Sequence, residues 1–165
     1  MRARAALLLP VALGVLLLDQ LSKLLIQTQI PLHTRIPVIP GLLDLTHIRN
    51  PGAAFGLFAS FPEGWRTPAL IAISLAALVV IVLFVRSLAP DRRLLLIALG
   101  LIMGGAAGNL LDRLRFGAVV DFIDAYWRTY HWPAFNVADS AVTGGVIAIL
   151  LDLWVGRKAE PAQSS

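Results

Sequence analysis

The chain has 165 residues, of which 58% are hydrophobic and 15% charged, and its mean hydropathy is +0.77. Soluble domains are about 45–50% apolar and about 25% charged, so this composition predicts a membrane protein. The formal charge is +4, but the 14 Lys and Arg residues stand in ones and twos between apolar runs, which argues against a nucleic-acid interface. The absence of cysteine excludes disulfides, thiolate nucleophiles and cysteine-based metal sites.

Four apolar segments follow one another along the chain, each close to the ~20 residues that a helix needs to cross a bilayer. They cover about residues 5–26, 68–88, 94–111 and 137–155. Such spans leave only short connections, so we expect one integral-membrane domain over residues 1–165, with a disordered tail at about 158–165.

The first segment begins like a secretory signal, because Arg2 and Arg4 precede an apolar core. Asp19 and Lys23, however, stand where a signal peptide would have a small-residue cleavage site. We therefore expect an uncleaved first membrane helix.

The connections between the segments differ in composition. Residues 27–67 contain five prolines and the alternating stretch HTRIPVIPGLLDLTHIRN, which predict a small extracytoplasmic β-sheet lying on the membrane. Residues 113–136 include FIDAYWRTYHWP, whose aromatic side chains suit a short interfacial helix or loop on the same side. The predicted fold is an all-α membrane protein with four transmembrane helices, this small sheet and this short helix or loop.

Basic residues near the ends of the segments predict the orientation. Short connections rich in Lys and Arg remain in the cytoplasm, whereas charges spread over long loops count less. Seven basic residues fall on one side of a four-helix arrangement: Arg2, Arg4, Arg86, Arg92, Arg93, Arg157 and Lys158. Both termini are therefore expected in the cytoplasm.

Asp19 and Lys23 are ionisable residues near the end of the first apolar segment. Their spacing of four residues puts them on one helical face, where they can neutralise each other. On their own they are explained by a structural ion pair or by a lysine that extends to the interface; the alternative is that they support a functional site.

Two further polar stretches need an explanation. In GGAAGNLLDRL, Gly104 and Gly108 predict close helix packing, and Asn109 and Arg113 share a neighbouring face. Polar side chains inside a membrane normally face a bundle interior or a cavity. In RNPGAAFG, the Asn50 amide can bridge donors and acceptors beside an Asn-Pro-Gly turn, although a plain turn explains the stretch as well.

Two aspartates beside apolar residues are the main candidates for chemistry. Asp121 lies within VVDFI, and Asp139 begins the fourth segment three residues after Asn136, a spacing typical of a helix N-terminus. Capping explains Asn136 better than Asp139, because the ~0.3–1 kcal/mol from a helix dipole does not cover the desolvation of a carboxylate in hydrocarbon.

Two carboxylates brought together would share one proton, so that one deprotonates a water while the other donates to a carbonyl oxygen. That is the chemistry of aspartic proteases. The alternative is a pair of unrelated interfacial aspartates. His33, His47 and His131 are not at metal-ligand spacing, so we expect neither a metal nor another cofactor.

Five motifs together resemble the lipoprotein signal peptidase (signal peptidase II) family, aspartic peptidases of bacterial inner membranes. In chain order they are Asp19-x-x-Ser22-Lys23, Asn50-x-Gly52-x-Ala54-Phe55, Gly104-Gly105-x-x-Gly108-Asn109-x-x-Asp112-Arg113, Val119-Val120-Asp121-Phe122 and Phe135-Asn136-x-Ala138-Asp139-Ser140. The resemblance implies that Asp121 and Asp139 are the catalytic dyad, and that a prolipoprotein loses its signal peptide just before a diacylglyceryl-modified cysteine.

The resemblance also assigns supporting roles. The positions that shape the site and hold substrate backbone are Asn50, Asn109, Arg113 and Asn136. Asp19 and Lys23 match a supporting polar pair, and Gly104 and Phe55 match packing or backbone-contact positions.

The same resemblance implies a multi-pass protein of the bacterial inner membrane with its active site near the periplasmic face, where the short helix or loop would also lie. The expected partners are a diacylglyceryl-modified prolipoprotein and membrane lipid, with no nucleic acid. A cyclic peptide inhibitor of the globomycin type would be expected to block the dyad.

The residues by themselves are also compatible with other classes of function. A small ion or proton transporter also places Asp, Lys, Asn and Arg inside a membrane, but transporters often show repeat symmetry, and no repeat is visible here. A non-enzymatic assembly factor would use the glycines and aromatic residues to bind partner helices. A presenilin-type protease lacks support, because no Gly-x-Gly-Asp occurs in the apolar segments.

Overall fold

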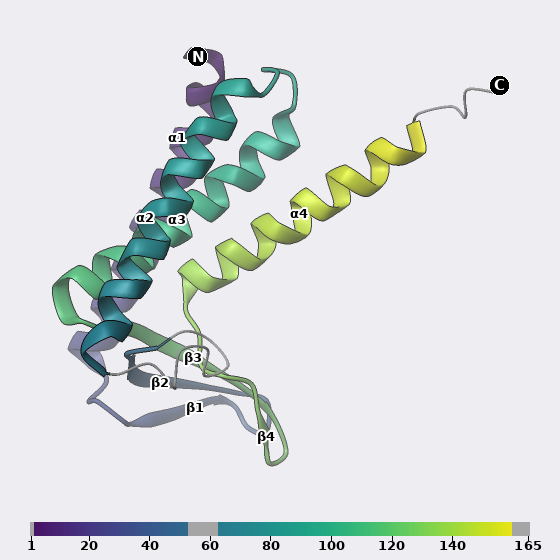
Figure 1. The fold of residues 1–165 in the computed structure, drawn as a ribbon. Coiled ribbons are helices and arrows are strands. Elements are labelled where there is room, and N and C mark those ends of the chain that lie inside the picture. Colours follow the sequence, from purple (N-terminus) through teal and green to yellow (C-terminus); the bar gives the residue numbers. More distant parts are fainter. Residues whose placement is uncertain (1, 53–62, 160–165) are drawn as a thin grey trace.

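The computed structural model describes residues 2–52 and 63–159 (Figure 1). The elements follow in the order α1 (Arg2–Gln29), β1 (Arg35–Ile39), β2 (Leu43–Asn50), α2 (Glu63–Ser87), α3 (Arg93–Phe116), β3 (Val119–Trp127), β4 (Tyr130–His131) and α4 (Val137–Ala159). The motif residues Ala54 and Phe55, and residues 160–165 of the expected tail, lie outside the described residues.

All four helices are long and apolar enough to cross a membrane, which confirms the four predicted transmembrane helices. α3 continues beyond the expected end near residue 111 to Phe116, so that Arg113 belongs to its last turn. Gly117 ends the helix in the left-handed conformation, with φ 71°, and its N–H donates to the Arg113 carbonyl oxygen. α4 continues to Ala159, into the first residues of the expected tail.

α3 is the central helix of the bundle and packs against α1, α2 and α4. Half of its membrane segment is buried, against 11–17% for the other three helices. Its glycines allow this central position. A Cβ on Gly104 would lie 2.5 Å from the Ala12 oxygen of α1, and one on Gly105 would collide with the Ala138 oxygen of α4. The helix backbones thus approach closely on both faces of α3.

The helices share one end and separate at the other. α4 meets α3 near the sheet and then slants away from the other helices (Figure 1). α1 begins, and α4 ends, at the end of the bundle that is remote from the sheet (Figure 1). An apolar cluster of Leu8, Ile81, Leu95 and Leu99 fills that remote end between α1, α2 and α3.

The four strands form one antiparallel sheet in the order β1-β2-β3-β4. The expectation of an interfacial helix or loop for residues 113–136 was wrong, because most of that connection is β3 and β4. VVDFIDAYW is rich in the β-branched and aromatic residues that strands favour, and β3 pairs with β2 over most of its length. The sheet predicted from residues 27–67 thus takes half its strands from a later part of the chain.

The register of this pairing positions the aspartate of β3. Asp121 pairs with Ile48, so it lies near Asn50 at the end of β2. Phe135, just before α4, accepts hydrogen bonds from the Phe122 and Ile123 N–H groups and donates one to the Ile123 oxygen. The start of α4 is therefore attached to β3 beside Asp121.

Candidate active site

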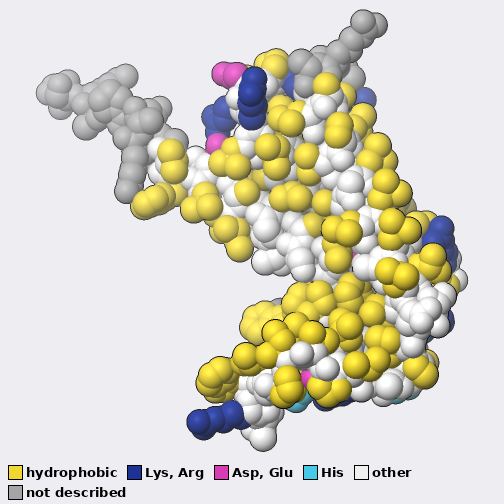
Figure 2. All heavy atoms as spheres, turned by 180° about the vertical axis from the view of Figure 1, so that it is seen from behind, with side chains coloured by type: hydrophobic (Ala, Val, Ile, Leu, Met, Phe, Trp, Pro, Cys, Tyr) yellow, Lys and Arg dark blue, Asp and Glu magenta, His cyan; other side chains and the backbone are white. Residues whose placement is uncertain are grey.

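Asp121 of β3 and Asp139 in the first turn of α4 line one cavity of about 720 Å³. Asn50, Asn109 and Arg113 line the same cavity. The molecule is deeply hollowed between α4 and the sheet, and the hollow opens sideways with hydrophobic side chains along its walls (Figure 2). The two aspartates that lie 18 positions apart in the sequence thus face a common space.

Asp121 is 2% exposed and accepts a hydrogen bond at each carboxylate oxygen. The Asn50 Nδ2 donates to its Oδ2 at 3.0 Å, and the Asn136 Nδ2 donates to its Oδ1 at 2.7 Å. Burial raises the pKa of Asp121 from 3.8 to about 7; the Asn50 hydrogen bond opposes this rise, and the Asp139 charge adds to it. The carboxyl group is therefore able to hold a proton near neutral pH.

Asp139 is likewise held at both oxygens. The Asn109 Nδ2 donates to its Oδ1 at 2.8 Å, and the Asn136 backbone N–H donates to its Oδ2 at 3.2 Å. In return, the Asp139 N–H donates to the Asn136 Oδ1 at 2.9 Å. This reciprocal pair is the N-terminal cap that the three-residue spacing predicts.

Asn136 connects the cap of α4 to both aspartates. It is fully buried, and besides Asp121 its Nδ2 lies within hydrogen-bond distance of the Val120 oxygen at 3.2 Å and the Asn109 Oδ1 at 3.3 Å. One side chain thus sets the start of a helix and the position of the Asp121 carboxylate.

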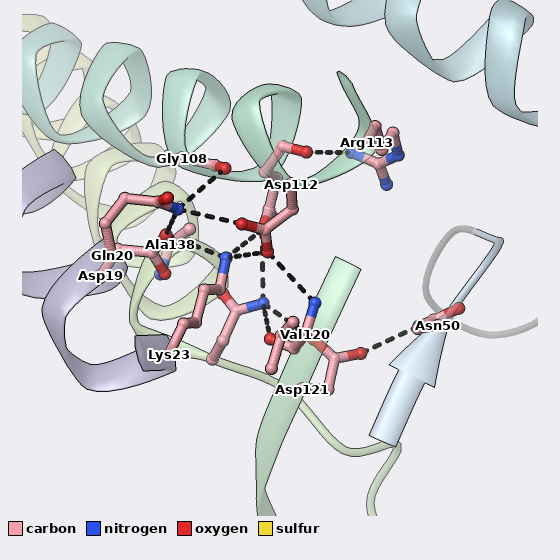
Figure 3. Close-up of polar contacts among 12 residues, drawn as sticks. Asp19, Gln20, Lys23, Asn50, Gly108, Asp112, Arg113, Val120, Asp121 and Ala138 are labelled. Atoms are coloured by element: carbon pink, nitrogen blue, oxygen red, sulfur yellow. Dashed lines mark hydrogen bonds and ion pairs between the residues drawn. The ribbon is translucent and has the colours of Figure 1, made fainter. Parts of the chain in front are cut away.

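Lys23 of α1 is a buried cation in the centre of the polar network (Figure 3). Its Nζ lies 2.8 Å from the Asp19 Oδ2, as the spacing predicts, and 2.8 Å from the Asp112 Oδ2. Its third contact is the Asn109 Oδ1, at 3.0 Å. Because an ammonium group only donates, Lys23 fixes which end of the Asn109 amide faces it and leaves the Nδ2 toward Asp139.

Asp19 extends the network to α4. Its Oδ1 accepts from the Ala138 N–H at 2.9 Å, one residue before Asp139. Gly108 makes room for this carboxylate, because a Cβ there would lie 2.5 Å from the Asp19 Oδ2. Gly104, by contrast, packs against Ala12 and Val15 of α1, and the structure does not bring it to the cavity.

Sequence reasoning missed Asp112 and Gln20 as site residues. The Asp112 Oδ2 also accepts from the Val120 N–H at 3.1 Å, next to Asp121, and its Oδ1 accepts from the Gln20 Nε2 at 3.0 Å (Figure 3). A carboxylate in the apolar α3, three residues after Asn109, was a signal for Asp112. Nothing but its place beside Asp19 marked Gln20.

Arg113 is a cation that lines the cavity. Its Nη1 donates to the Asn109 oxygen at 3.3 Å and its Nη2 to the Gly52 oxygen at 3.4 Å. Its Nε is buried with no partner among residues 2–52 and 63–159. The guanidinium thus keeps donor capacity beside the cavity.

The histidines take part in contacts of the sheet. The His47 Nδ1 lies 2.9 Å from the Ile30 oxygen, and the His131 Nδ1 lies 2.9 Å from the Asp124 Oδ1. Within the described part of the chain, no three His, Asp or Glu side chains are grouped so that they would hold a metal ion.

Comparison with known proteins identifies the family. The family "Signal peptidase (SPase) II" matches residues 11–155. The lipoprotein signal peptidase of Geobacter sulfurreducens is 51% identical over 143 residues, 87% of this chain and 88% of that protein. The lipoprotein signal peptidase of Nitratidesulfovibrio vulgaris is 43% identical over 157 residues, 95% of this chain and 93% of that protein.

Two solved structures share the fold. One is a bacterial membrane enzyme determined by the in meso method at 2.3 Å resolution; it is 30% identical with a TM-score of 0.82, over 96% of this chain and 93% of that one. A second, at 1.9 Å resolution, is 32% identical with a TM-score of 0.78, over 88% and 91%. The chain therefore belongs to the signal peptidase II family, and is a multi-pass membrane protease that removes signal peptides from lipoproteins.

Proposed function

We propose that this chain is an aspartic endopeptidase in which Asp121 and Asp139 form the catalytic dyad. Its substrate is a prolipoprotein, which it cleaves immediately before the diacylglyceryl-modified cysteine. The observation that carries the proposal is that two carboxylates from separate elements line one cavity, each with both oxygens held by amide donors. Because the chain belongs to the signal peptidase II family, we no longer consider the transporter and assembly-factor alternatives.

The chemistry needs one proton on the pair. The pKa of Asp121, raised by burial to about 7, supports a state with one carboxyl protonated and one ionised at neutral pH. The ionised group takes a proton from a water molecule, whose oxygen attacks the scissile carbonyl carbon. The protonated group donates to the carbonyl oxygen, which gives a tetrahedral intermediate. The C–N bond then breaks as the carboxyl that took the water proton gives it to the leaving amine. Because water is the nucleophile, no acyl-enzyme forms.

The remaining polar residues have positioning and substrate-binding roles in this proposal. Asn50, Asn109 and Asn136 orient the carboxylates, and the buried Asp19–Lys23 pair holds Asn109 and the start of α4. Preorganised groups lower a barrier because they need not reorganise during the reaction. Arg113, with donors beside the cavity, is proposed to hold a substrate backbone carbonyl.

The shape of the cleft supports sideways entry of the substrate. The cavity walls include Trp132 and Phe135 near the sheet and Ile147 on α4, and the hollow between α4 and the sheet is open at the side (Figure 2). The signal peptide would enter from the bilayer while the lipid chains stay in it. A globomycin-type cyclic peptide is expected to occupy the same cavity.

The orientation belongs to the same proposal. The sheet and the dyad lie at one end of the bundle, and Arg4, Arg86, Arg92 and Arg93 lie at the other (Figure 1). By the positive-inside tendency, the arginine-rich end and both termini are cytoplasmic. The active site then lies near the periplasmic face of the bacterial inner membrane.

The test is cleavage of a synthetic diacylglyceryl-modified prolipoprotein in detergent by wild type, Asp121→Asn and Asp139→Asn. Each substitution should lower kcat by at least about 10³-fold, as for other residues that act directly in catalysis. Asp124→Asn, which alters another buried carboxylate of β3, should remain active, and the unlipidated precursor should remain uncut. Wild-type rates in either dyad variant would refute the two-aspartate mechanism.

A further inference from the structure

A second cavity lies at the end of the bundle remote from the sheet and has a volume of about 190 Å³. α1 and α2 form its walls, and Met103 of α3 contributes to it as well. Its charged members are Arg4 and Arg86, and its other lining residues are apolar. It is separate from the dyad cavity, with which it shares no residue.

The apolar part of this cavity is open to the outer surface of the helices. Leu9 and Val82 line it and are 49% and 42% exposed. Both belong to membrane-spanning helices, so the surface they expose faces hydrocarbon. An apolar slot in that position is suited to a lipid chain rather than to water.

The two arginines have unused donor capacity. The Arg4 Nη1 donates to the Arg86 carbonyl oxygen at 2.7 Å, near the C-terminal end of α2. The Arg4 Nε is buried and has no partner among residues 2–52 and 63–159. No ion pair joins Arg4 or Arg86 to a carboxylate within these residues. A guanidinium in such a place favours an anionic oxygen ligand.

We propose that this cavity binds one anionic phospholipid, with its phosphate at Arg4 and Arg86 and one acyl chain in the apolar slot between α1 and α2. Basic pockets between membrane helices are suited to anionic headgroups, because charge and an apolar surface meet at the depth where headgroup and chain join. A free phosphate ion would satisfy the arginines but leave the slot unfilled. The bound lipid would join α1 to α2, each of which packs mainly on α3.

The test is native mass spectrometry of the full chain in detergent with dioleoylphosphatidylglycerol, and separately with dioleoylphosphatidylcholine. Wild type should retain one phosphatidylglycerol and be stabilised by it against thermal unfolding more than by phosphatidylcholine. The double variant Arg4→Gln/Arg86→Gln should lose about tenfold or more in affinity for phosphatidylglycerol. Arg93→Gln removes a charge at the same end outside the cavity and should change affinity little.

A matched pair tests the slot without changing charge. Ala5→Phe places a ring in the cavity and should abolish retention, whereas Ala6→Phe, at an exposed neighbour outside it, should not. Cleavage activity in phosphatidylcholine-containing detergent shows that each variant is folded. Equal loss in Arg93→Gln, full retention in Ala5→Phe, or equal stabilisation by inorganic phosphate would each overturn the proposal.

Discussion

The two ends of the helical bundle are built differently. At the sheet end, the space between the helices is filled by buried polar side chains: Asp19, Lys23, Asp112 and Asn136 are at most 1% exposed. At the remote end, the corresponding space holds the apolar cluster of Leu8, Ile81, Leu95 and Leu99. The same bundle therefore has one end built for packing and one built for polar chemistry.

The polar filling at the sheet end is expected to stabilise the fold less than the apolar filling at the remote end. Buried ion pairs often contribute little or nothing to net stability, because desolvation offsets their attraction. An apolar filling would serve packing equally well, as the remote end demonstrates. The polar network is instead explained by its contacts with the dyad. Lys23 contacts Asn109, which donates to Asp139, whereas Asp112 and Asp19 accept from Val120 and Ala138, the neighbours of the two aspartates.

Among changes to the polar network at the sheet end, Lys23→Met is expected to have the largest effect on stability and on kcat. It leaves Asp19 and Asp112 as uncompensated buried carboxylates, a change that typically costs about 3–5 kcal/mol. It also frees the Asn109 amide, so kcat should fall by about 10²-fold or more because the dyad loses its alignment. Thermal unfolding and cleavage of the lipidated substrate measure the two effects. Unchanged kcat in the folded fraction would show that the network serves stability alone.

A smaller and more selective loss is expected from Asp112→Asn. The shape is kept, but one acceptor facing Lys23, Gln20 or the Val120 N–H becomes a donor. We expect kcat to fall on the order of tenfold to 10²-fold, with KM little changed, because the residue does not line the cavity. Asp124→Asn is the matched control. An equal loss in both variants would assign the effect to folding rather than to positioning.

The dependence of the cleavage rate on pH tests whether the polar end of the bundle holds a proton at the dyad. If the protonated carboxyl is the acid, cleavage should fall by about tenfold per pH unit above a pH of about 7, where both carboxylates ionise. Initial rates between pH 5 and 9 measure this. A rate that keeps rising through pH 9 would contradict a proton held by Asp121.

The same pKa has a consequence for stability. Burial is the main reason that the pKa of Asp121 rises from 3.8 to about 7 in the folded state. Between these two pH values the folded chain therefore binds a proton that the unfolded chain lacks. Its contribution to stability therefore declines as pH rises from about 4 to about 7. Asp121→Asn should remove that decline, which thermal unfolding across the range would detect.

A smaller loss of cleavage activity is expected from Gly105→Ala. Its Cβ would collide with the Ala138 oxygen and displace the start of α4, which carries Asp139. A small displacement of a catalytic group costs rate steeply, so cleavage should fall by roughly tenfold. Gly14→Ala, where a Cβ would meet no atom within 4 Å, should be silent. Equal activity of the two variants would mean that α4 adjusts without moving the dyad.

The smallest effect on catalysis is expected at the apolar end. Leu99→Ala opens a cavity in the remote cluster, where Leu99 is 5% exposed, and should lower stability by about 2–4 kcal/mol. The kcat of the folded enzyme should change by less than about twofold, because Leu99 packs in an apolar cluster and does not line the dyad cavity. A large fall in kcat would show that the two ends are coupled through α3.

The amino-acid sequence alone was enough to predict the four membrane helices, a sheet within residues 27–67, the capping spacing of Asn136 and Asp139, and the Asp19–Lys23 pair. These features depend on periodicity and on contacts within a few residues of the chain, where 3.6 residues per helical turn decide which side chains meet.

The remaining features depend on contacts between distant parts of the chain. β3 is a strand because β2, some 70 residues earlier, supplies its hydrogen bonds, and no local pattern separates that outcome from an aromatic interfacial loop. Asp112 became part of the site only when α1 brought Lys23 and Gln20 to α3. The partner of a buried charge must come from elsewhere in the chain, because burial in a membrane removes the water that would otherwise solvate it.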